Sequence, residues 1–165
     1  MTATPVPTPP LAGKKTLVVD VANEHSIAWG CAKAFHELGA AAPLMTEGGT
    51  LFAMSYYGAG KVVDNYNLMG PVKAALEAAC RYFAFELGPR RIRVHPILRG
   101  PLKMRAASGL KDFDLLLADA AQKAPIGELA DIMDVGFACA YLATPYARRI
   151  TGGTIYVDGG VHVVA

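Results

Sequence analysis

Short apolar runs alternate along this chain with stretches in which apolar residues recur every three or four positions. The short runs are rich in β-branched and aromatic residues, which predicts strands buried on both faces; they lie at 14–20 (KKTLVVD), 49–57 (GTLFAMSYY), 91–98 (RIRVHPIL) and 152–160 (GGTIYVDGG). The longer stretches predict amphipathic helices, at 26–38, 112–123 and 131–144. A further helix is expected from Tyr66 or Gly70 to Leu87, where a Gly-Pro pair ends it.

The order of these elements predicts the fold class. Alternation of strand and helix is typical of an α/β fold, here a Rossmann-like doubly wound parallel sheet with helices packed on its faces. In such a sheet, ligands bind at the carboxyl ends of the strands. The 165 residues fit one domain. Because the first ten residues contain four prolines, we expect a flexible tail over residues 1–12 and a single domain over residues 13–165.

Composition narrows the function classes. The chain is 53% hydrophobic and 18% charged, which excludes disorder for most of its length. A formal net charge of +2 is too small to indicate a nucleic acid or an anionic membrane as the partner. The basic run at 88–93 (GPRRIR) is expected to be a solvated corner. No apolar run is long enough to span a membrane and the first residues lack the features of a secretory signal, so a cytoplasmic protein is expected.

The cysteines and histidines form no recognisable metal site. Cys31, Cys80 and Cys139 are far apart and lie within apolar helical patterns. Their odd number and their spacing argue against a disulfide framework and against metal ligation, so we expect small buried thiols in a reducing compartment. The four histidines are scattered, without an HExxH or similar pair, and no metal is expected.

The candidate chemistry follows the second predicted strand. Tyr66 and Lys73 are seven residues apart, which on a helix places them on nearly the same face, about 10 Å apart along the axis. A lysine cation near a phenol favours the phenolate. The spacing alone fits better with a structural pair, in which the aromatic residue is packed and the lysine reaches to solvent. The preceding strand, which ends in Ser55-Tyr56, favours a functional site instead. Pro71 lies between the pair and costs about 3 kcal/mol in a helix unless it sits in the first turn.

Residues 55–78 (SYYGAGKVVDNYNLMGPVKAALEA) resemble the active-site segment of the NADH-dependent enoyl-acyl-carrier-protein reductases, a branch of the short-chain dehydrogenase/reductase family. The spacing of Tyr56, Tyr66 and Lys73 matches that of most bacterial members. Three further segments resemble, in order, the family's first turn and helix, its substrate loop and its final strand, at residues 21–40, 100–113 and 151–160.

The resemblance implies a reaction and roles for three residues. The reaction is transfer of a hydride from NADH to the β-carbon of a trans-2-enoyl thioester on acyl carrier protein, a step of fatty acid biosynthesis. Tyr66 is then expected to donate a hydrogen bond to the thioester carbonyl and to stabilise the enolate. Lys73 is expected to hold the nicotinamide ribose, and Tyr56 to line the acyl pocket.

On the cofactor side, the resemblance implies contacts from Ser26 and Ile27, at the start of the first helix, where backbone N–H groups can hold an anion. It also implies a backbone contact from Leu102 to the nicotinamide amide. Asp20 stands where the family has a glycine, so its carboxylate is expected to repel a pyrophosphate about 4 Å away by roughly 4 kcal/mol. Arg99, at the end of the third predicted strand, could supply a compensating cation.

A large segment of the family pattern is missing from this chain. Family members carry several further strands and helices between the first helix and the strand before the tyrosines. The first strand is therefore expected to pair directly with the strand at 49–57, or to leave an edge and a gap, in a reduced sheet of about four strands. Helix faces that lose their partners would be exposed, and a homo-oligomer could cover them.

Two functions remain open on the sequence. The first is an NADH-dependent enoyl reductase of reduced architecture, supported by the retained tyrosines, the lysine and the first-helix residues. The second is a non-catalytic shortened remnant that oligomerises or binds acyl chains. Asp20 and the missing segment support this second function.

Overall fold

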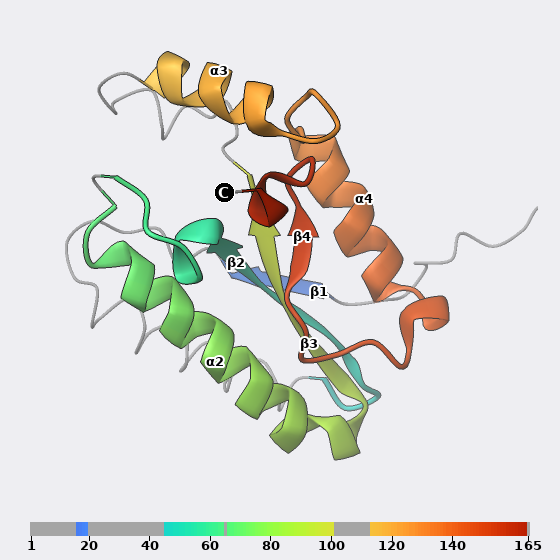
Figure 1. Cartoon of the computed structure of the whole chain (residues 1–165). Helices are drawn as coiled ribbons and strands as arrows, with labels where there is room; N and C mark the ends of the chain where they lie inside the picture. Colours follow the sequence, from blue (N-terminus) through green and yellow to red (C-terminus); the bar gives the residue numbers. More distant parts are fainter. Residues whose placement is uncertain (1–15, 20–44, 65, 101–112, 165) are drawn as a thin grey trace, which may run out of the picture.

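The fold is built on one parallel sheet (Figure 1). The computed structural model of this chain describes residues 16–19, 45–64, 66–100 and 113–164. Four strands pair in the order β1-β2-β3-β4: β1 (Thr16–Val19), β2 (Gly49–Tyr56), β3 (Ile92–Arg99) and β4 (Ile155–Val157). This confirms the α/β class and the expected sheet of about four strands.

The first strand pairs directly with the strand that leads into the tyrosines. Thr16 lies opposite Thr50 and Val19 opposite Ala53, in parallel register. The direct pairing expected from the missing family segment is therefore confirmed. It leaves the described sheet with β1 at one edge and β4 at the other.

Helix α2 (Met69–Leu87) covers one face of the sheet. Its apolar side chains pack against alternate residues of β2 and β3 because successive strand residues point to opposite faces. The buried cluster on this face comprises Met45, Leu51, Ala53, Leu76, Cys80, Ala84, Ile92 and Val94. The short 3-10 helix η3 (Gly88–Arg90) ends α2, and Arg91 turns the chain into β3 with a φ of 58°.

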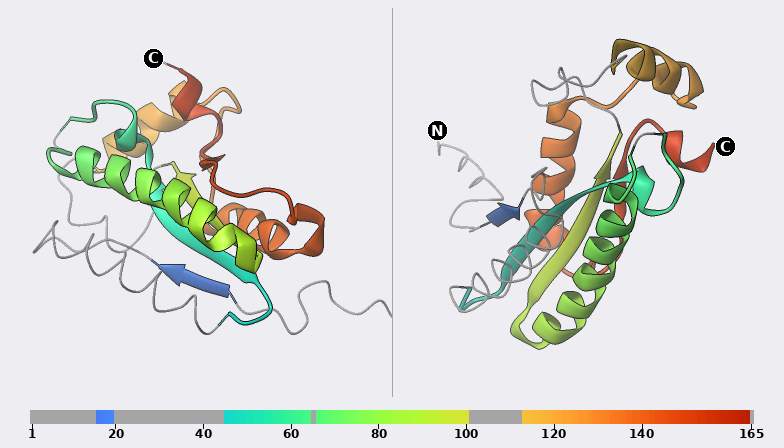
Figure 2. Two further views of the ribbon diagram at one scale, coloured as in Figure 1. Left: turned by 90° about the horizontal axis from the view of Figure 1, so that it is seen from below. Right: turned by 90° about the vertical axis from the view of Figure 1, so that its left-hand side faces the viewer.

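Helix α4 (Ile132–Ala143) covers the opposite face (Figure 2). There the buried cluster comprises Phe52, Ile97, Leu142 and Ala147, with half-buried apolar residues packed around it. The connections from β2 to β3 and from β3 to β4 advance in the same direction along the sheet. Because α2 and α4 lie on opposite faces, the two crossovers have opposite hands, an uncommon arrangement for parallel strands.

Three segments that are far apart in the sequence gather near the carboxyl ends of the strands (Figure 1). They are the 3-10 helix η2 (Tyr57–Ala59), helix α3 (Phe113–Lys123) with the turn after it, and the 3-10 helix η6 (Val161–Val163). The N–H of Ile126 donates to the carbonyl of Gly159 at 3.3 Å, and Lys61 Nζ donates to the carbonyl of Val164. These contacts join the three segments around the edge of the sheet where a ligand is expected.

Helix α2 begins later than one of the two expected starts. It starts at Met69, so Pro71 is its third residue and lies in the first turn, where a missing N–H costs no hydrogen bond. Tyr66 therefore lies outside the helix. The 3-10 helix η5 (Pro145–Ala147) follows α4, close to the expected end at residue 144. The expectations for the tail at 1–12 and for the helix at 26–38 fall outside the described residues.

The described residues include neither a membrane-spanning helix nor a cluster of metal ligands. No helix among them is long and apolar enough to cross a membrane. Within the same residues, no group of three or more histidine, cysteine or acidic side chains is arranged to hold a metal ion. Of the expected buried thiols, Cys80 is buried and Cys139 is partly buried, while Cys31 lies outside the described part of the chain.

Candidate functional site

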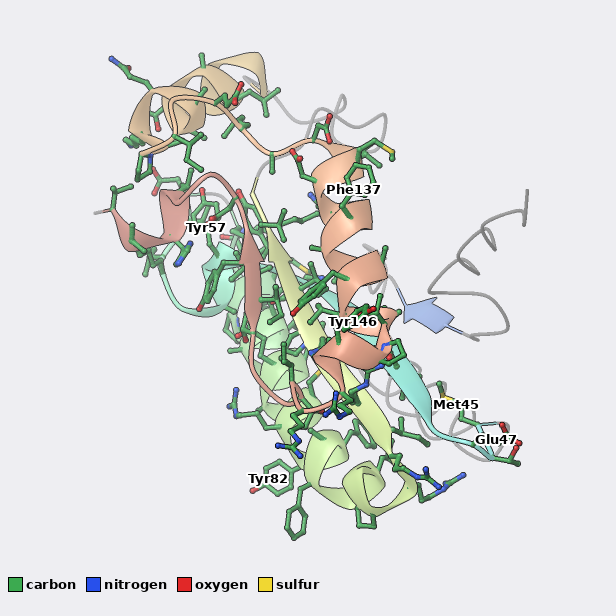
Figure 3. The ribbon with its side chains drawn as sticks, turned by 90° about the vertical axis from the view of Figure 1, so that its right-hand side faces the viewer. Met45, Glu47, Tyr57, Tyr82, Phe137 and Tyr146 are labelled. Atoms are coloured by element: carbon green, nitrogen blue, oxygen red, sulfur yellow. The ribbon has the colours of Figure 1, made fainter. Side chains whose placement is uncertain are left out.

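Three tyrosines meet at the carboxyl end of β2. Tyr56 is the last residue of the strand, Tyr57 begins η2, and Tyr66 lies in the loop before α2. The ring centroids of Tyr56 and Tyr66 are 5.1 Å apart, and those of Tyr56 and Tyr57 are 4.3 Å apart. Figure 3 labels Tyr57 at this end of the molecule. The structure thus brings together the two tyrosines that the sequence singles out, and it adds a third.

A turn and a glycine, rather than a helix, hold Tyr66 in place. Its N–H donates to the carbonyl of Val63 at 3.1 Å, and its own carbonyl accepts from the N–H of Met69 at 3.0 Å. Asn67 follows in the left-handed region, with a φ of 47°. A Cβ on Gly58 would lie 2.6 Å from the Tyr66 ring, so the ring rests directly on that glycine. The prediction that Tyr66 and Lys73 share one helical face is therefore wrong.

Lys73 reaches the site through the packing of α2 on the sheet. It is the fifth residue of α2 and only 6% exposed. Its Nζ donates a hydrogen bond of 2.8 Å to the carbonyl of Met54, two residues before the end of β2. A buried ammonium is stable only when hydrogen-bonded. The side chain is thus not a lysine that extends into solvent, which was the alternative interpretation of the pair.

Burial controls the acidity of the phenols. It raises the pKa of Tyr66 to about 12, against a smaller lowering by the Arg99 guanidinium and a further increase from Tyr57. Burial, followed by a hydrogen bond with Tyr57, also raises the pKa of Tyr56 well above its ordinary value. The cation that favours the phenolate of Tyr66 is the Arg99 guanidinium, and desolvation outweighs it. Both phenols keep their protons at neutral pH.

A carboxylate on α2 bonds the helix to β2 and to the residue that precedes β4. Ser55 Oγ donates to Glu77 Oε1, and Thr154 Oγ1 donates to Glu77 Oε2 at 3.2 Å. Glu77 lies four residues after Lys73 and so on the same helical face. Glu77 was not predicted as a site residue, although its position four residues after Lys73 can be seen in the sequence.

Arg99 lies opposite Tyr56 in the sheet, a position that the sequence did not indicate. The sequence suggested it only as a cation that could offset Asp20. In the structure, Arg99 is the last residue of β3 and lies opposite Tyr56 in the parallel pairing of β2 and β3. The signal that could have found it is the register of two strands of equal length that end together.

Three of the four residues expected to contact the cofactor lie outside the described part of the chain. Ser26, Ile27 and Leu102 lie outside the described residues, and so does Asp20. Their roles therefore stay predictions. Lys73 is the one predicted cofactor residue within the described part of the chain.

The arrangement suits one kind of chemistry. Two partly buried, protonated phenols and a buried ammonium lie at the carboxyl end of a parallel sheet. Hydrogen-bond donors held in a desolvated site stabilise negative charge that develops on a ligand oxygen, because they need no reorganisation when the charge forms. A carbonyl compound that becomes an enolate is such a ligand.

Comparison with known protein sequences assigns the chain to a family. A family model described as Enoyl-(Acyl carrier protein) reductase matches residues 38–162. The NADH-dependent enoyl-acyl-carrier-protein reductase of Bacillus subtilis is 40% identical over 126 residues, which are 76% of this chain and 49% of that protein. The chain spans about half the length of the curated relatives it matches.

Solved structures show the same fold. The enoyl-acyl carrier protein reductase of Bacillus cereus, solved with NADP+ and indole naphthyridinone, matches with a TM-score of 0.80 at 32% identity, over 93% of this chain and 67% of that one. The reductase of Anaplasma phagocytophilum, solved in complex with NAD, matches with a TM-score of 0.77 at 35% identity, over 93% of this chain and 64% of that one.

Proposed function

This chain belongs to the enoyl-acyl-carrier-protein reductase family, and from that premise we propose that it reduces the double bond of a trans-2-enoyl thioester. The thioester is carried by acyl carrier protein in fatty acid biosynthesis, and NADH supplies the hydride. The observation that carries the proposal is the contact between the Tyr56 and Tyr66 rings at the carboxyl end of β2, with the buried Lys73 ammonium bonded to the carbonyl of Met54, two residues before Tyr56.

Tyr66 is the proposed catalytic donor. A phenol whose pKa is raised to about 12 keeps its proton at neutral pH and can donate it in a hydrogen bond to the thioester carbonyl oxygen. That bond strengthens as the oxygen gains negative charge, which lowers the barrier. Tyr56 packs against the Tyr66 ring and lines the acyl pocket. Because burial keeps both phenols protonated, neither acts as a base here.

Lys73 is the proposed residue that holds the cofactor. An ammonium carries N–H donors, and the hydroxyl oxygens of a ribose accept such bonds. The hydrogen bond from Nζ to the carbonyl of Met54 orients this group near the carboxyl end of β2, so the donor set fits a nicotinamide ribose. Ser26, Ile27 and the backbone of Leu102 would hold the rest of the dinucleotide. The Bacillus subtilis relative is named for NADH and the Bacillus cereus structure holds NADP+, so both forms belong in the test.

The test is turnover of a crotonyl thioester, followed by the loss of reduced-cofactor absorbance. The parent chain is expected to consume NADH, and Tyr66→Phe to lower kcat/KM by about 100-fold, because one oxyanion donor is lost. Tyr82→Phe removes the same hydroxyl from an exposed tyrosine on α2 and is the matched control, with unchanged turnover. Equal rates in the Tyr66→Phe and parent chains would contradict the role of Tyr66.

Binding of the cofactor is measured separately. NADH at about 100 times its Kd is expected to raise the free energy of unfolding by about 2.7 kcal/mol, and Tm rises with it. No turnover with either cofactor, together with no change in Tm, would contradict the reductase proposal. The chain would then be a non-catalytic member of its family.

A cytoplasmic homo-oligomer is part of the proposal. Its support is the large apolar surface that both helices expose: Tyr82 is 72% and Phe85 84% exposed on α2, and Phe137 is 67% exposed on α4. Figure 3 labels Tyr82 and Phe137 on these two helices. Exposed aromatic patches of this kind mark protein contacts. Sedimentation of the chain and of its Phe85→Glu variant tests the proposal: the parent is expected as an oligomer and the variant as a smaller species. A parent that sediments as a monomer would contradict it.

The proposed domain organisation is a Pro-rich tail over residues 1–12 followed by one Rossmann-like domain over residues 13–165. Deletion of residues 1–12 is expected to leave the free energy of unfolding within about 0.5 kcal/mol of the parent. A larger loss would show that the tail packs against the domain.

A further inference from the structure

The ends of β2 and β3 place a cation beside the tyrosines. The two strands pair residue by residue, and the last pair is Tyr56 with Arg99. Residues opposite each other in a sheet point to the same face, so both side chains leave the sheet on one side at the same edge. The ring of Tyr56 in turn contacts the ring of Tyr66. The register therefore brings the guanidinium to the two phenols.

The backbone after Arg99 fixes this position. The N–H of Gly100 donates to the carbonyl of Val157 at 3.2 Å, which joins the end of β3 to the end of β4. A Cβ on Gly100 would lie 3.2 Å from the Cβ of Asp158, so the two segments are in close contact. Arg99 is thus presented by a paired strand end rather than by a loose loop, and its side chain is partly buried.

The charges around Tyr66 come from several elements. Tyr56 contacts its ring from β2, and Tyr57 acts on its phenol from η2. Lys73 on α2 directs Nζ to the carbonyl of Met54. Arg99 acts on both Tyr56 and Tyr66, and in each case it favours the phenolate against the effect of burial. Partial burial reduces screening by salt, so the effect of the guanidinium persists at physiological ionic strength.

We propose that Arg99 is a positioning residue of this site, whose positive charge acts on the Tyr66 phenol and through it on the oxygen that gains negative charge. The consequence for the reaction rests on the proposed function, whereas the charge effect on Tyr66 does not. The proton of Tyr66 is polarised toward the ligand because a partial negative charge on the phenol oxygen is stabilised by the guanidinium.

The experiment reads the titration of residue 66 directly. A fluorinated tyrosine at position 66 is more acidic than tyrosine, so it titrates at a pH at which the chain stays folded, and its fluorine resonance reports the ionisation. Four chains are compared: the parent, Arg99→Met, Arg99→Lys and Arg148→Met, which makes the same change at an exposed arginine. Circular dichroism at each pH shows that every chain is folded.

The expected result is an upward shift of the titration midpoint by about 0.5 to 1 pH unit in Arg99→Met. The midpoint stays near that of the parent in Arg99→Lys and Arg148→Met, because these chains keep the charge beside Tyr66. An unchanged midpoint in Arg99→Met would overturn the proposal. An equal shift in Arg99→Lys would also overturn it, since the effect would then follow shape rather than charge. Because the readout needs neither substrate nor cofactor, its failure is separate from a failure of the proposed reaction.

Discussion

Helices α2 and α4 cover opposite faces of the same sheet, but they are attached to it in different ways. Lys73 and Glu77 bond α2 to β2 from the interior of the helix. Helix α4 is bonded to the sheet at its end, where Arg93 from β3 donates to carbonyl groups of Ala143 and Ala147. Its start is closed by a capping box of Asp131 and Asp134, which is internal to the helix.

From this difference we expect changes on α2 to affect the tyrosine site and changes on α4 to affect mainly the stability of the fold. The polar anchors of α2 end on Met54 and Ser55, which immediately precede Tyr56. A change in those anchors therefore reaches the tyrosines. Arg93, the polar anchor of α4 on the sheet, lies six residues before Arg99, near the start of β3, so it is expected to determine stability and to leave the site unchanged. Variants on the two faces test this division.

The largest expected effect is on the α4 face, at His95. This side chain is fully buried, stacks on Phe52, and has no hydrogen-bond partner for either ring nitrogen among the described residues. Burial, with a smaller contribution from Arg93, lowers its pKa to about 4. Between pH 6.5 and 4 the unfolded chain binds a proton that the folded chain does not, so the free energy of unfolding falls as the pH falls through this window.

His95→Leu removes the ionisable imidazole, so neither the folded nor the unfolded variant binds a proton at this position. Over the same window, the parent is expected to lose about 3 kcal/mol more stability than the variant. Urea unfolding at a series of pH values measures the difference. Parallel pH profiles for the two chains would show that His95 is not held neutral by burial.

Arg93→Met is expected to cost about 2 kcal/mol at neutral pH. The guanidinium donates to the carbonyls of Ala143 and Ala147 at 3.3 and 3.1 Å, and charged hydrogen bonds of this kind stabilise by about 1.5 to 3 kcal/mol. Arg148→Met is the control, with a change below about 0.5 kcal/mol. The titration midpoint of residue 66 stays at its parent value. A shifted midpoint would break the division between the two faces.

Glu77→Gln tests whether a change on α2, unlike one on the α4 face, reaches the tyrosine site. One carboxylate oxygen that accepts from Ser55 or Thr154 is replaced by a donor, which costs about 1 kcal/mol. Unlike Arg93→Met, this variant is expected to lower turnover and to move the titration of residue 66, because Ser55 adjoins Tyr56. A loss of stability with both readouts unchanged would contradict the role given to α2.

The smallest effect is expected at the start of α4. Asp131→Ala removes the carboxylate that accepts from the N–H of Asp134 at 2.9 Å, and a lost cap costs about 1 kcal/mol. Turnover stays at the parent value. A change in kcat would show that α4 is coupled to the site.

The sheet and its helices could be predicted because buried strands and amphipathic helices have distinct periods in the sequence. Direct pairing of β1 with β2 followed from the missing family segment and is confirmed. The exposed helix faces were also foreseen, and aromatic side chains such as Phe85 occupy them.

The detail of the site could be predicted only in part. The Tyr-Lys spacing was interpreted as one helical face, which the structure does not have, since Tyr66 is held by the turn at Asn67 and by the surface of Gly58. These are local backbone contacts that leave no periodic signal. Arg99 was noted only as a cation that could offset Asp20; its position opposite Tyr56 was missed because it is set by the register of two strands, which neither strand contains alone. The predictions for Ser26, Ile27 and Leu102 stay predictions.

The most direct test of the account follows the transferred hydrogen. The chain is mixed with crotonyl thioester and NADH that carries deuterium at C4, with each of the two C4 positions labelled in a separate sample, and the product is examined by NMR. We expect one deuterium on the β-carbon from one of the two labelled forms, and the loss of most of this product in Tyr66→Phe. A saturated product without deuterium from either form, or no saturated product at all, would contradict it.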